Sequence, residues 1–123
     1  MKSRESNLRS KRFEADEKAR KVADLQHMVR EFESMAADLD RQIQSEEDRT
    51  GIKDVTHFAY STFAKAAAQR RANLKASVED LLAKLDAALR ERDAAAADLQ
   101  AATAPDPRET ERQRRNGHLG LTR

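Results

Sequence analysis

Two long stretches of the chain repeat small and apolar side chains every seven residues, with a second set of positions three residues further on. In the first stretch these positions are Leu8, Ala15, Val22, Val29, Ala36 and Ile43, with Leu25, Phe32 and Leu39. In the second they are Ala64, Val78, Leu85 and Leu99, with Arg71 and Arg92 at two positions of the same series, and Ala67, Leu74, Leu81, Ala88, Ala95 and Ala102. Such sustained heptads are typical of helices that pack along a narrow seam as a coiled coil. The fold class is therefore predicted to be all-α.

The composition agrees with a coiled coil and argues against other classes of protein. Ala, Arg, Leu, Glu and Lys make up more than half of the 123 residues, and the chain has only 3 Gly and 2 Pro. A β-sheet protein would need more β-branched residues, and a compact enzyme would need more bulky apolar ones. The absence of Cys excludes disulfides, zinc ribbons and thiol catalysis.

Breaks in the heptads predict one long antiparallel hairpin over residues 1–104. The first helix is expected at about 5–49, because Gly51 can adopt the left-handed conformation that ends a helix. An apex loop follows at about 50–60, and the second helix at about 61–103 ends before two prolines. The start of this second helix stays open among three candidate N-caps, Asp54, Thr56 and Ser61.

Residues 105–123 are predicted to be a flexible tail. This segment contains both prolines of the chain, two of its three glycines, many charges and few apolar side chains. Such a segment cannot bury enough apolar surface to offset the entropy that ordering costs.

The distribution of charge independently favours the antiparallel arrangement. Residues 1–21 carry a net charge of +4, residues 31–54 carry −5, residues 55–78 carry +4 and residues 79–104 carry −3. In an antiparallel hairpin, positive segments face negative ones in both halves, whereas parallel pairing would set like charges together. The same match holds for two different chains, so a domain-swapped or four-helix dimer stays open beside the intramolecular hairpin.

No pattern of residues in the sequence indicates catalysis. The three histidines, His27, His57 and His118, are far apart and form no zinc motif, and no Gly-rich phosphate loop is present. We therefore expect no enzymatic activity, no metal and no cofactor. Nucleic-acid binding is not expected either, because acidic residues stand beside the basic ones. Without an apolar signal or membrane-spanning segment, the protein is expected to be cytoplasmic.

The predicted apex concentrates aromatic and basic residues. The candidate partner-binding residues here are His57, Phe58, Tyr60, Phe63, Gln69, Arg70 and Arg71. The aromatic rings either seal the end of the two-helix core or present an anchor to a partner protein. Both interpretations stay open at this point.

The opposite end of the predicted hairpin, which holds both termini, has little apolar material. Basic residues occupy or flank its seam: Arg9, Lys11, Arg12, Lys18 and Arg92. Their packing should be weak, so this end either frays or becomes ordered inside a partner.

Three segments of the chain resemble the FliJ family of flagellar export proteins, in the form found in alphaproteobacteria. They read SRESNLRSKRFEADEKARKVADLQ, MAADLDRQIQSEE and HFAYSTFAKAAAQRRANL, and the likeness covers about residues 3–100. The third segment is the most specific, because a coiled coil does not dictate its aromatic residues and paired arginines. The tail is unlike what is expected of the family.

The resemblance implies a non-enzymatic stalk, similar to the central stalk subunit of rotary ATPases. It implies partners in the flagellar type III export apparatus, at the base of the flagellum: the export ATPase, the cytoplasmic domain of the export gate and export chaperones. Contact with the membrane would be through these partners only. We expect the terminal end to face the ATPase ring and the apex to face the gate or chaperones. The alternative is a generic α-hairpin adaptor or chaperone that binds a single protein.

Overall fold

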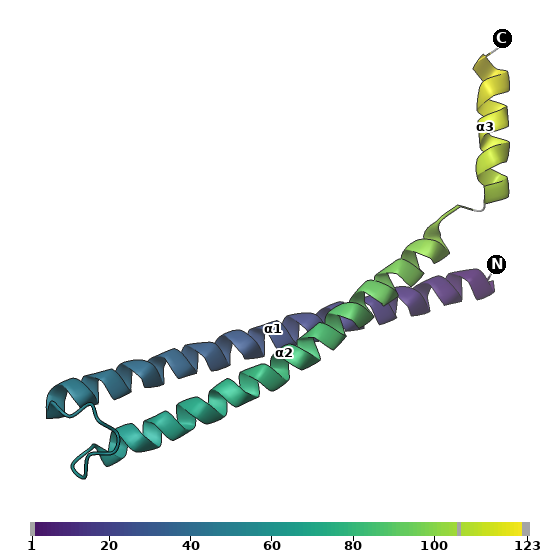
Figure 1. Cartoon of the computed structure of the whole chain (residues 1–123). Helices are drawn as coiled ribbons and strands as arrows, with labels where there is room; N and C mark the ends of the chain where they lie inside the picture. The colour runs from purple at the N-terminus through teal and green to yellow at the C-terminus, as the bar shows by residue number, and fades with distance from the viewer. Residues whose placement is uncertain (1, 106, 122–123) are drawn as a thin grey trace.

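The computed structural model describes residues 2–105 and 107–121 of the chain. Its helices are α1 (Lys2–Thr50), α2 (Thr62–Thr103) and α3 (Pro107–Leu121), and no strand occurs among the described residues. Figure 1 shows α1 and α2 running antiparallel and side by side, joined by a loop at one end. The prediction of an all-α, two-helix hairpin is confirmed.

The helix boundaries have local causes that agree with the predicted ranges. At the end of α1, Gly51 has a φ of 75°, and its N–H donates a hydrogen bond to the carbonyl of Glu47 at 2.8 Å. This left-handed conformation ends the helix. At the start of α2, the Ser61 hydroxyl accepts a hydrogen bond from the N–H of Ala64 at 3.2 Å. Ser61 is therefore the N-cap among the three candidates.

The core is a narrow seam made of two clusters of heptad side chains. The cluster nearer the middle of the hairpin consists of Val22, Leu25, Val29, Leu81 and Ala88. The cluster nearer the apex consists of Leu39, Ile43, Tyr60, Ala64 and Ala67. Apart from Tyr60, all of these are heptad positions identified from the sequence, so the predicted register of both helices is confirmed.

Ion pairs between the helices follow the predicted match of charged segments. In the terminal half, Lys18 lies 3.3 Å from Glu91, and Lys11 lies 3.9 Å from Asp98. In the apex half the signs are reversed, since Arg71 of α2 donates to Asp40 of α1 at 2.6 Å. Each half of the hairpin thus joins a positive segment to a negative one.

The terminal end of the hairpin has almost no buried core. Among the described side chains of α1, none before Val22 is buried, and after Ala88 the buried side chain described on α2 is Ala95. Alanines and lysine stems fill most of the seam there, and Leu8 and Leu99 are only half-buried, so little apolar surface is removed from water. Packing is therefore strongest toward the apex, as the sequence predicts.

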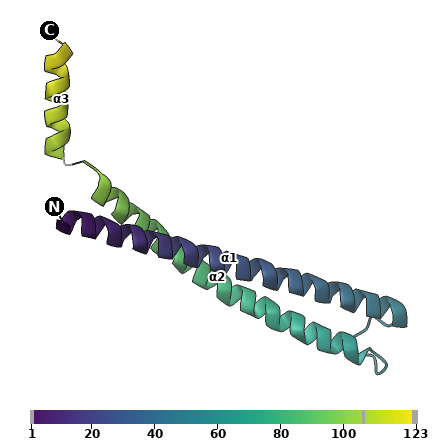
Figure 2. The same cartoon turned by 180° about the vertical axis from the view of Figure 1, so that it is seen from behind.

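Helix α3 stands away from the hairpin beyond the end of α2 (Figures 1 and 2). Within the described part of the chain it packs against neither α1 nor α2. An isolated helix of 15 residues is marginal in water. A segment that gains no tertiary contacts fits the predicted flexible tail, although its backbone is helical here.

Amide hydrogen exchange should report this gradient of packing along the hairpin. We expect residues 5–20 and 92–103 to exchange faster than residues 25–43 in the free protein, because local opening costs least where few apolar contacts form. NMR measures these exchange rates residue by residue. Uniform protection along both helices would contradict the argument.

Candidate functional site

The apex loop is held in a defined shape by its own hydrogen bonds. One carboxylate oxygen of Asp54 accepts from both the N–H and the hydroxyl of Thr56, at 2.9 and 2.7 Å. The N–H of His57 donates to the carbonyl of Asp54 at 3.1 Å, and the N–H of Tyr60 donates to that of His57 at 3.0 Å. These bonds to Thr56 lower the pKa of the Asp54 carboxyl. The loop is therefore preorganised by two successive turns.

Two acidic residues near the end of α1 fasten the loop to the helices. The Tyr60 hydroxyl donates to a carboxylate oxygen of Glu47 at 2.8 Å, and the Ser61 hydroxyl donates to Glu46 at 3.0 Å. Hydrogen bonds from Arg49, and then from Ser61, lower the pKa of Glu46. The bond to Glu47, with some burial, raises the pKa of Tyr60. This polar clasp replaces the apolar layers that two helices cannot supply at their end.

Phe58 stands at the tip of this rigid loop with its ring in solvent. The side chain is 95% exposed, and it stacks on the ring of His57 at a centroid distance of 4.7 Å. Nδ1 of His57 in turn accepts a hydrogen bond from the N–H of Ala59 at 3.0 Å. An exposed aromatic ring on a hydrogen-bonded loop is the kind of group that anchors protein interfaces.

The structure thus divides the aromatic cluster between the two roles that the sequence left open. Tyr60 is 7% exposed and belongs to the core cluster nearer the apex, so it does not face a partner. Phe58, His57 and Phe63 are exposed, and Phe63 lies in the first turn of α2. The apex has one core ring and three outward rings.

The residues of the basic turn after the apex also have different roles. Gln69 hydrogen-bonds Asn73 within α2 at 3.3 Å. Arg71 reaches across the seam to Asp40, and this hydrogen bond lowers the pKa of the Asp40 carboxyl. Arg70 has no ion pair among the described residues and lines an open groove between the helices. Arg71 therefore ties the hairpin together, whereas Arg70 is available to a partner.

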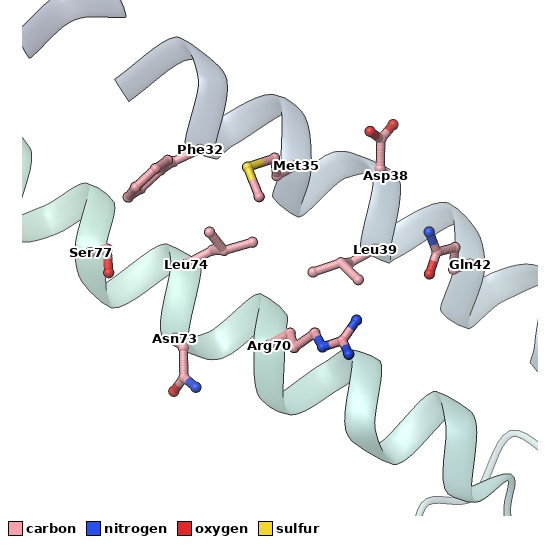
Figure 3. Close-up of a pocket in the computed structure, with 9 residues that line it drawn as sticks. All are labelled: Phe32, Met35, Asp38, Leu39, Gln42, Arg70, Asn73, Leu74 and Ser77. Carbon is pink, nitrogen blue, oxygen red and sulfur yellow. The ribbon is translucent and has the colours of Figure 1, made fainter. Parts of the chain in front are cut away.

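The sequence analysis missed that groove, which Figure 3 shows on one face of the apex half. It encloses about 510 Å³ between the helices. Phe32, Met35 and Leu39 of α1 line it opposite Leu74 and Arg70 of α2. The available signal was Met35, an apolar residue just outside the predicted seam, which is 50% exposed.

At the terminal end, the predicted basic residues divide into bridging and free groups. Lys11 and Lys18 are half-buried and reach α2, and the hydrogen bond from Lys18 is the main reason that the pKa of Glu91 is lowered. Arg92 instead pairs with its neighbour Asp93 at 3.0 Å.

Three residues of this end face outward from α1. Arg9 and Arg12 are exposed, as is the ring of Phe13, which the sequence analysis did not select. Phe13 is 67% exposed and lies opposite the seam in the heptad. The terminal end therefore also presents an aromatic ring, here beside two arginines.

The described residues include no cluster that could hold a metal ion and no helix that could span a membrane. No group of three or more His, Cys, Asp or Glu side chains among them could hold a metal ion. His27 contacts Glu31 on the helix surface at 3.3 Å, and the side chain of His118 lies outside the described residues. No helix within the described ranges has both the length and the apolar character to cross a membrane.

Comparison with known proteins identifies no relative. No protein-family model, curated protein or solved structure matches the chain.

Changing Tyr60 and Phe58 separately should distinguish the core ring from the exposed one. Tyr60→Phe should lower the urea midpoint of unfolding, because it removes the hydrogen bond to Glu47 at a buried position. Phe58→Ala should leave the free energy of unfolding within about 0.5 kcal/mol of wild type, because its ring is exposed. Equal destabilisation by both variants would contradict these roles.

The Arg71–Asp40 pair should make stability depend on pH in one direction. Its lowered pKa means that Asp40 stabilises the fold above the ordinary value of 3.8 and loses this contribution as the pH falls through the lowered value. Asp40→Asn should therefore melt below wild type near neutral pH. The difference in Tm should vanish in acid, where wild-type Asp40 is protonated. A difference that persists in acid would assign the effect to something other than the pair.

Proposed function

We propose that this protein is a non-enzymatic stalk of the flagellar type III export apparatus, which links the export ATPase ring to the export gate. The observation that carries the proposal is a slender two-helix rod with different surfaces at its two ends. At 1.5 Å per residue, the 42 residues of α2 span roughly 63 Å. One chain can thus contact two partners that are far apart, as the resemblance to the FliJ family also implies.

The terminal end suits the ATPase ring. Two packed helices are only about 20 Å wide, which suits insertion into the centre of a ring. The exposed Arg9, Arg12 and Phe13 offer charged and aromatic contacts there. Since few apolar contacts hold this end together, it can adjust to the ring at low cost in folding free energy.

The apex suits the cytoplasmic domain of the gate or an export chaperone. Its loop is preorganised by hydrogen bonds, so little conformational entropy is lost when Phe58 enters a pocket on the partner. The clasp from Tyr60 to Glu47 and the Arg71–Asp40 pair connect the loop to the rod. A displacement at one end is thereby passed to the other, while ATP hydrolysis is carried out by the ATPase alone.

Variants at the two ends should separate the two contacts. We expect R9E/R12E to reduce the effect of the protein on turnover and ring assembly of the purified export ATPase, while binding to the gate domain is kept. Phe58→Ala should do the reverse. The charge-reversal control is Arg90→Glu, an exposed residue of α2 that pairs with Asp86 on its own helix and should affect neither.

Turnover assays, native mass spectrometry of the ring and pull-down with the gate domain measure these outcomes. If wild-type protein changes neither turnover nor ring assembly, the stalk function is wrong. Binding to a single partner without any effect on the ATPase would instead support the adaptor alternative.

A further inference from the structure

One face of the hairpin is charged in its terminal half and apolar in its apex half. In the terminal half, the positions that flank the seam hold opposite charges that approach each other, as in Lys21 and Glu91 at 3.7 Å. In the apex half, the corresponding positions hold Met35 and Ser77, which line the groove and leave it open. We propose that this groove is an interface between two copies of the chain, whose apex halves lie face to face as a four-helix bundle and point the same way, while each terminal half stays a two-helix rod.

The level of each residue along the hairpin decides what such a dimer would bring together. The residue numbers of the interhelical pairs Lys11–Asp98, Lys18–Glu91 and Arg71–Asp40 add to 109, 109 and 111, so residues whose numbers add to about 110 lie at similar height. A two-fold axis along the groove places α1 of one copy over α2 of the other at equal height. A groove residue on α1 of one copy then meets a residue on α2 of the other copy. That α2 residue is the same one that lies opposite it across the groove within a single hairpin.

The side chains that meet in this way are apolar or small, and one of the two pairs combines a large residue with a small one. Phe32 comes over Ser77 of the other copy, so that a large ring faces a small residue, and Met35 comes over Leu74. All four line the groove in the single chain. Pairing large with small across facing positions is how packed layers interdigitate. The exposed surface of Met35 would be removed from water.

The charges on the two rims of the groove are also self-complementary. Asp38 on α1, which also pairs with Arg41 on its own helix, and Arg70 on α2 lie at nearly the same height, and the two-fold axis sets each beside the other residue of the second copy. Asp24 and Lys84 would meet in the same manner, and neither has an ion pair within the described ranges. Symmetry makes each contact twice. Glu31 and Asp80 also come together and oppose the association.

Other arrangements fit less well. A two-fold axis across the hairpins would bring the −5 segments at 31–54 of both copies together, which is repulsive. As a helix, the chain's own α3 does not reach the groove, because Leu74 lies roughly 44 Å back along α2 from Thr103. The 15 residues of α3 span only about 22 Å. A second copy, with its matched charges and sizes, is the occupant that the described surface favours.

Sedimentation of the purified full-length chain over a range of concentrations tests this dimer. We expect a monomer–dimer equilibrium that Asp38→Arg or Arg70→Asp weakens about tenfold or more, since each sets like charges together at two sites. The double variant D38R/R70D should restore association, and Asp80→Lys should strengthen it. Circular dichroism confirms that each variant stays helical. A monomer at every concentration, or no rescue in the double variant, would overturn the proposal.

Two further measurements use matched controls. Met35→Glu should abolish the dimer, whereas Leu82→Glu, at a similarly exposed apolar residue (47%) that does not line the groove, should leave it intact. The chain contains no Cys, so Val55→Cys gives a single spin label near the apex. A short distance between the labels in the dimer supports hairpins that point the same way. Labels out of range of each other would refute that arrangement. The tests need no export component, so their failure leaves the proposed stalk function standing.

Discussion

The packing of small and apolar side chains along one seam holds α1 and α2 together, and two helices provide no second layer behind it. The stability of each part of the hairpin therefore depends on which side chains this single row of contacts buries. Bulky side chains such as Leu25 and Leu39 concentrate in the middle and toward the apex. The Ala- and Lys-filled terminal end has little to bury. The gradient of packing is thus a direct result of which residues occupy the heptad.

Polar interactions complete what the seam cannot provide. At the apex, Glu46 and Glu47 accept hydrogen bonds from residues of the loop, and Ser61 caps the second helix. Along the rod, the reversal of charge between the halves fixes which helix ends lie together. An open groove remains where flanking residues are apolar or short and no such pair closes the face. The two-helix hairpin thus combines a hydrogen-bonded loop, a loosely packed terminal end and an accessible groove on one side.

Much of the molecule could be predicted from residue patterns, whereas the candidate sites could be predicted only in part. The heptads identified the buried residues of both helices, and the charge segments identified their relative direction. The exposed position of Phe58 and the core position of Tyr60 could not be distinguished, because both follow from the path of a loop that has no periodicity. Phe13 could not be selected from the heptads, because it lies on the face opposite the seam. Its exposure is known only from the structure.

The sequence by itself determined two helices, the heptad positions that they bury and their antiparallel direction. Periodicity and charge act through regular helical geometry, which the order of residues expresses directly. Only the tertiary structure decided that Tyr60 closes the core while Phe58 faces solvent, that Arg71 binds Asp40 while Arg70 stays open, and that a groove separates the helices beside Met35. These features depend on the distance between two helices and on the turn that joins them, which no residue pattern encodes alone.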